Sequence, residues 1–98
     1  YIPEIRKAYQ IAFYMNHDLL IYLREFIFYT QAEKDEIYET ALEFIQKHKQ
    51  YIYPRLVSAS INRACLDALC RADKERFMYL SDNLSKIYQD ELKIKRQV

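Results

Sequence analysis

The side chains best suited to acid–base or metal chemistry are two histidines and a group of glutamates near the middle of the chain. Neither His17 nor His48 belongs to an H-x-x-x-H pair, and no glutamate stands three residues before either, so zinc-peptidase and di-iron spacings are absent. Glu36, Glu39 and Glu43 could act in acid–base catalysis only if burial raised the pKa of one carboxyl group. They fall on the polar face of a predicted helix, where water solvates them. We therefore expect a protein that is not an enzyme, with no catalytic residue, metal or cofactor.

The two cysteines are the remaining nucleophiles. Cys65 and Cys70 are five residues apart in a predicted helix, which places them about 140° apart around its axis, so they cannot bridge each other there. We expect each to be a buried, free thiol that packs as a small apolar side chain. Free cysteines fit a reducing compartment inside the cell.

Cations and aromatic side chains alternate in the segment 47–55. Lys47, Lys49 and Arg55 could hold phosphates while Tyr51 and Tyr53 stack on bases, which is how proteins bind single-stranded RNA. The other interpretation is a helix C-terminus whose lysines complement the helix dipole, followed by tyrosines that pack on the domain. The 15 Lys and Arg against 14 Asp and Glu leave a net charge of +1, which favours the second interpretation. A helical-repeat-like module for single-stranded RNA remains the alternative function, but we do not expect a nucleic-acid partner.

Aromatic residues are the strongest functional signal, because the chain has ten tyrosines and five phenylalanines. The segment Leu19–Tyr29 is apolar around nearly its whole circumference, interrupted only by Arg24 and Glu25. A small domain cannot cover such a helix on all sides, although a thick core could absorb part of it. We expect the uncovered part to be a protein-docking patch. Its candidate residues are Tyr22, Phe26, Phe28 and Tyr29, with Arg24 at the rim.

The elements that must position these residues are predicted to be helices. The chain has no glycine, which excludes P-loops, dinucleotide-binding glycine motifs and nucleophile elbows, and leaves no glycine for tight hairpin turns. Hydrophobic residues make up 51% of the 98, so we expect a folded chain and not a disordered one. We expect one all-α domain over 1–98, a compact bundle or short array of helical hairpins. Its five helices are predicted at about 3–15, 19–29, 30–49, 55–71 and 73–93.

Local signals predict the helix boundaries. Asp18 is predicted to cap the second helix after a break at 16–18, and the Thr30–Glu33 segment reads as a capping box for the third. Pro54 interrupts the helical pattern, Asp73 is predicted to cap the fifth helix, and that helix is expected to fray near Lys93. The first helix has an apolar stripe that should face the core, made of Ile5, Ala8, Tyr9, Ala12 and Met15.

The segment Cys65–Lys74 resembles the end of the first helix of a pentatricopeptide repeat. The resemblance covers about a tenth of the chain, and no period of roughly 35 residues recurs, so it implies only paired helices. No stretch is apolar enough to span a membrane, because charges interrupt the best window, Ile11–Tyr29. We therefore predict an accessory or scaffold subunit that docks to protein partners in a larger complex. The subunit-like size and the absence of an initiator Met suggest the mitochondrion.

Overall fold

The computed structural model describes residues 3–97, and every regular element in that range is a helix, which confirms the all-α prediction. Four longer α-helices are joined by short α-, π- and 3-10-helical turns. In chain order the elements are α1 (Pro3–Phe13), the π-helical turn η1 (Tyr14–Asp18), α2 (Leu19–Arg24), the 3-10 turn η2 (Phe26–Phe28), α3 (Gln31–Lys47), the 3-10 turns η3 (Lys49–Tyr51) and η4 (Pro54–Leu56), α4 (Ser60–Cys70) and α5 (Lys74–Gln97).

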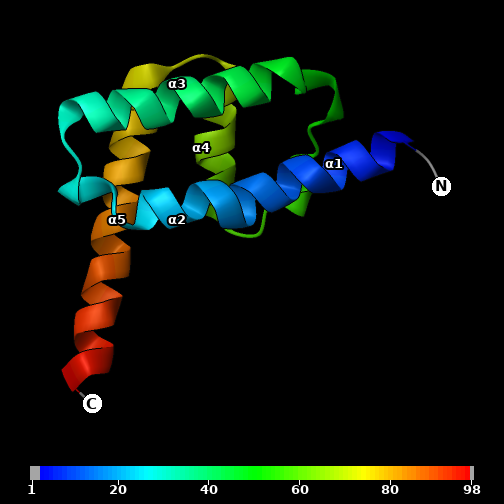
Figure 1. The fold of residues 1–98 in the computed structure, drawn as a ribbon. Helices are drawn as coiled ribbons and strands as arrows, with labels where there is room; N and C mark the ends of the chain where they lie inside the picture. The colour runs from blue at the N-terminus through cyan, green and yellow to red at the C-terminus, as the bar shows by residue number, and fades with distance from the viewer. Residues whose placement is uncertain (1–2, 98) are drawn as a thin grey trace.

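The helices form two layers that cross each other (Figure 1). In the front layer α1, η1 and α2 follow one another as a single rod, and α3 lies beside this rod and runs back along it. Behind them lie α4 and the first half of α5, roughly at right angles to the rod. The second half of α5 extends away from the body of the molecule.

The predicted break at residues 16–18 is wrong, because the chain stays helical through a π turn. Asp18 has helical dihedral angles and its side chain caps nothing. Asn16 explains the difference: its amide donates to the carbonyl oxygen of Leu56 at 3.1 Å, and its side-chain oxygen accepts from the amide of Ser58 at 2.9 Å. Because these bonds reach a segment 40 residues away in the chain, Asn16 fastens the rod to the loop before α4 instead of ending a helix.

Other predicted boundaries hold where the signal is local. The Thr30 hydroxyl accepts from the Glu33 amide at 3.2 Å, and the Glu33 carboxylate accepts from the Thr30 amide at 2.8 Å, so the capping box is confirmed. The Asp73 carboxylate likewise accepts from the amide of Arg76 at 3.1 Å at the start of α5. Residue 53 is extended before Pro54.

Three helix limits differ from prediction. The fourth helix was expected from Arg55, but α4 begins at Ser60 after a 3-10 turn and an extended stretch. The second helix ends at Arg24, and a 3-10 turn follows where helix was expected to continue to Tyr29. Conversely α5 continues to Gln97, past the expected fraying near Lys93. No glycine or proline interrupts it there, and two basic residues in its last turn complement the negative end of the helix dipole.

The turn between α4 and α5 is made without glycine. Ala72 has φ = 54°, in the left-handed region that glycine normally occupies at a helix end. The amide of Asp73 donates to the carbonyl oxygen of Ala68 at 2.8 Å, and the amide of Ala72 donates to that of Leu69 at 3.2 Å. This pair of bonds is a Schellman motif, and it reverses the chain so that α5 can pack on α4.

The core lies between the two layers, and aromatic rings form its centre. The Phe77 ring meets the Phe26 ring edge-on, with centroids 6.2 Å apart, and lies 5.3 Å from the Tyr38 ring. Ser85 fixes the end of α2 above them, because its hydroxyl donates to the carbonyl oxygen of Arg24 at 2.9 Å and accepts from the amide of Ile27 at 3.2 Å. These contacts place the exposed residues of the N-terminal third on a rigid support.

Candidate docking surface

A row of exposed side chains runs along the rod. Ile5, Tyr9, Phe13, His17 and Ile21 each follow the previous one by four residues, and the four apolar members are between 50% and 62% exposed. The His17 ring stacks on that of Phe13, with centroids 4.5 Å apart. We call these five residues the α1 row.

The π turn η1 limits how far the α1 row winds around the rod. In an α-helix a step of four residues overshoots one turn by about 40°, so a row of this spacing winds around the helix. A π turn rotates less per residue and cancels part of that drift between Phe13 and Ile21. Isolated π turns inside helices occur frequently at functional sites.

Sequence reasoning missed the α1 row because it assigned Ile5 and Tyr9 to the buried stripe of the first helix. The structure buries Ala8, Ala12 and Met15 of that stripe as predicted and adds Ile11, but it leaves Ile5 and Tyr9 exposed. Phe13, a large aromatic residue outside the predicted stripe, was the available signal.

The structure divides the docking patch predicted within 19–29. Phe28 is 65% exposed and Tyr22 is also exposed, but Phe26, two residues before Phe28, is 0% exposed and belongs to the core. Tyr29 is half-buried and packs against the core. The guanidinium of Arg24 lies 5.0 Å from the centre of the Tyr88 ring, so this residue contacts α5. Tyr22 and Phe28 therefore remain as exposed aromatic candidates, and Phe26 does not.

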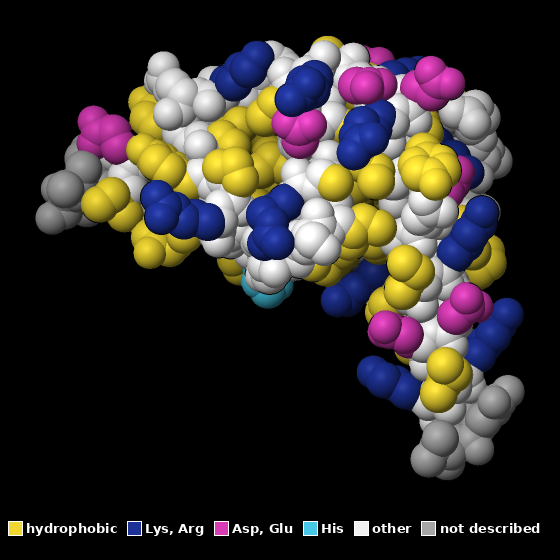
Figure 2. Space-filling model, turned by 180° about the vertical axis from the view of Figure 1, so that it is seen from behind, with side chains coloured by type: hydrophobic (Ala, Val, Ile, Leu, Met, Phe, Trp, Pro, Cys, Tyr) yellow, Lys and Arg dark blue, Asp and Glu magenta, His cyan; other side chains and the backbone are white. Residues whose placement is uncertain are grey.

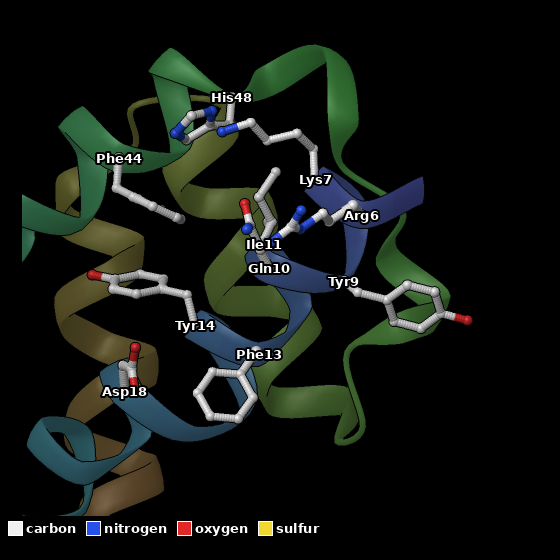
Figure 3. Close-up of a pocket in the computed structure, with 10 residues that line it drawn as sticks. All are labelled: Arg6, Lys7, Tyr9, Gln10, Ile11, Phe13, Tyr14, Asp18, Phe44 and His48. Carbon is white, nitrogen blue, oxygen red and sulfur yellow. The ribbon is translucent and has the colours of Figure 1, made fainter. Parts of the chain in front are cut away.

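A groove of about 620 Å³ separates α1 from the C-terminal end of α3; we call it the α1–α3 groove (Figure 3). Figure 3 shows the Lys7 side chain reaching across its upper end toward His48, while Asp18 lies at the other end. Burial lowers the pKa of His48, and the nearby charges of Lys7 and Lys47 lower it further. Arg6 also lines this upper end, which is therefore positively charged.

Aromatic rings form the middle of the α1–α3 groove. The rings of Tyr14 and Phe44 lie 4.4 Å apart between the rod and α3, and the Phe44 ring meets the His48 ring at 4.9 Å. Burial, with a smaller contribution from the carboxylate of Asp18, raises the pKa of Tyr14 from 10.0 to about 12. The Tyr14 hydroxyl therefore stays protonated at neutral pH.

A second groove, of about 350 Å³, continues between α2 and α3, and we call it the α2–α3 groove. Tyr22 and Tyr29 line it on the rod side and Ile37 on the α3 side. Its carboxylates come from Asp18, Glu33 and Glu36, so its charge is opposite to that of the upper end of the α1–α3 groove.

The residues of the RNA interpretation do not form one stacking surface. Lys47, Lys49 and Arg55 are exposed, as phosphate contacts would be. Tyr51, however, packs against the core, and only Tyr53 of the two tyrosines is exposed. Of the two tyrosines expected to stack on bases, Tyr51 is therefore occupied in packing on the domain, and only Tyr53 is accessible to a base.

The side chains considered for catalysis or metal binding do not gather. Within residues 3–97 no three His, Cys, Asp or Glu side chains are close enough to hold a metal ion together. Cys65 and Cys70 are free, as predicted, and burial raises the pKa of both thiols, that of Cys65 from 9.0 to about 11. Only Cys65 is fully buried, so the expectation that both are buried is wrong for Cys70.

None of the helices in the described range is long and apolar enough to cross a membrane. Comparison of the chain with protein-family models, with curated proteins and with solved structures finds no match.

Proposed function

We propose that this chain is a non-catalytic accessory or scaffold subunit that docks to protein within a larger assembly. One observation carries the proposal: large apolar side chains at least half exposed are concentrated at one end of the chain. Among the described residues, ten large apolar side chains are about half exposed or more, and six of these lie between the start of α1 and the end of η2. The six are Ile5, Tyr9, Phe13, Ile21, Tyr22 and Phe28. Exposed aromatic and aliphatic side chains gathered in this way are typical of protein interaction surfaces.

The support beneath these side chains suits a docking role. Buried neighbours hold them on a helical rod, because Met15, Leu19 and Leu23 on the opposite face of that rod are all in the core. Asn16 ties the middle of the exposed segment to the loop before α4, and Ser85 ties the end of α2 to α5. A rigid presentation of this kind reduces the entropy that a partner must remove on binding.

The proposal extends to the compartment. The free cysteines support a reducing environment inside the cell. Residence in the mitochondrion is the more specific prediction, and localisation of the tagged chain by microscopy would test it.

Two matched pairs of substitutions test the docking function in cells that express the protein. Ile21→Asp and Ile94→Asp change the same residue type at the same 62% exposure, on the rod and on the projecting part of α5. Phe28→Asp and Tyr79→Asp compare two aromatic residues at 65% and 66% exposure. All four should fold, because a carboxylate at an exposed position remains solvated.

The measurement is the size of the particle that contains the tagged chain, on native gels and by gel filtration. We expect the wild type, Ile94→Asp and Tyr79→Asp to migrate in a large assembly, and Ile21→Asp and Phe28→Asp to be released from it with unchanged helix content. Migration of the wild type on its own, or retention of both Ile21→Asp and Phe28→Asp in the assembly, would contradict the proposal.

A further inference from the structure

The α1–α3 and α2–α3 grooves are two parts of one valley between the rod and α3. They share Tyr14 and Asp18, which line both. The lining residues of both grooves come from the rod and the following turn on one side and from α3 and His48 on the other, and Figure 1 shows the rod and α3 running in opposite directions beside each other. A partner that lies along this valley would therefore contact both grooves at once.

The valley has one positive end and one negative end. Lys7, with Lys47 also near His48, marks the positive end, while Glu33 and Glu36 mark the negative end. The cause is the antiparallel arrangement, since the basic start of the rod lies beside the basic end of α3. Lys7 and Glu36 take part in none of the ion pairs among the described residues, so both charges are available to a partner.

We infer that the partner in this valley is a second copy of the same chain, related by a two-fold axis that passes near Tyr14. Such a rotation reverses the direction of the valley, so it places the positive end of each copy over the negative end of the other. The charges are thus complementary twice in one interface, as an isologous dimer requires. The inference rests on the proposed docking function and names the partner of the same N-terminal surface.

The α1 row supplies the apolar contacts of this dimer. Tyr9 and Phe13 stand at the rim of the α1–α3 groove, where the side chains of an i, i+4 row can pack into the groove of a facing helix pair. The rod is about 33 Å long and, with α3, about 20 Å wide, which gives a footprint of roughly 660 Å² per copy. Specific interfaces bury about 600–1,000 Å² per partner, so the available face lies at the lower end of this range.

Figure 2 shows the molecule from behind, with the projecting half of α5 as a separate arm. Yellow, dark blue and magenta side chains alternate along this arm, so positive and negative charges are mixed instead of separated. The arm has no comparable separation of positive and negative ends, so charge substitutions on it serve as controls for those in the valley.

Substitutions that reverse the charge at each end of the valley test the inference. The dissociation constant of the dimer is measured for each purified variant by sedimentation equilibrium near pH 7. We expect a particle of twice 12.0 kDa, with a dissociation constant raised about tenfold or more by Lys7→Glu or by Glu36→Lys. The double variant exchanges both ends, so its dissociation constant should return to within about threefold of the wild-type value. Phe13→Asp should abolish the dimer, whereas Lys93→Glu on the exposed arm should leave it unchanged.

The outcomes separate this inference from the proposed function. A 12.0 kDa species at millimolar concentration, open-ended association, or a dimer insensitive to Lys7→Glu overturns the two-fold arrangement. If Ile21→Asp still leaves the assembly in cells in any of these cases, the docking function stands without the second copy. A charge-dependent dimer whose Ile21→Asp variant remains in the assembly would support the two-fold arrangement and contradict docking of the rod to other proteins.

Discussion

Substitution of Ala72 by glycine is expected to stabilise the protein. Ala72 is an exposed residue with φ = 54°, so its methyl group makes no packing contribution that glycine would lose. The left-handed conformation costs a residue with a Cβ about 1–2 kcal/mol. Glycine avoids this cost but adds about 0.4–1 kcal/mol of conformational freedom to the unfolded chain. The difference predicts that Ala72→Gly raises the free energy of unfolding by about 0.5–1 kcal/mol.

Thermal and urea denaturation followed by circular dichroism measure this change. For a domain of this size the gain corresponds to a rise in Tm of roughly 2–8 °C. Ala64→Gly is the matched control, because Ala64 lies inside α4 with helical geometry. It should lower the free energy of unfolding by about 1 kcal/mol. If Ala72→Gly lowers Tm, the α4–α5 turn is not the strained Schellman motif that we describe.

Three further predictions concern single groups. Ser85→Ala leaves the amide of Ile27 without its partner, while the carbonyl oxygen of Arg24 keeps its bond from Gln89. Urea titration should therefore show a loss of about 1–3 kcal/mol, and no loss would contradict this role. Because burial raises the pKa of Cys65 from 9.0 to about 11, the stability linked to its protonated thiol is complete below pH 9 and is lost as the pH rises toward 11. The fall in unfolding free energy between pH 8 and 11 should therefore be smaller in Cys65→Ala than in the wild type. The side chain of Gln89 makes the last hydrogen bond from α5 to the body among the described residues, so amides of α5 beyond it should exchange with solvent much faster than those near Phe77, and uniform protection along α5 would refute this.

Local chemistry made several elements predictable from the sequence. The capping box at Thr30–Glu33 and the cap at Asp73 involve residues three apart, so the pattern contains the whole interaction. Asn16 could not be interpreted in this way, because its partners lie about 40 residues away in the loop before α4. A polar residue that usually ends a helix is used here for a tertiary contact.

The docking candidates were only partly predictable for a related reason. Phe26 and Phe28 are two residues apart and lie on roughly opposite faces of a helix, but nearly every residue of 19–29 is apolar, so the pattern did not mark the buried face. The structure places Phe26 in the core with Leu19 and Leu23 and leaves Phe28 exposed. The Tyr22 and Phe28 predictions are compatible with the structure, but their role as a docking site stays a prediction. The charged valley depends on the antiparallel placement of α3 beside the rod, which no local pattern contains.

Photo-crosslinking from single positions tests the docking surface most directly. A photoreactive phenylalanine placed at position 21 on the rod, or at the equally exposed position 94 on the α5 arm, is irradiated in intact cells, and the adducts are separated by mass. Docking through the rod predicts adducts of one or a few discrete masses from position 21 and little or none from position 94. Equal yields from the two positions, or no adduct from position 21, would show that the exposed apolar side chains of the rod do not dock to protein.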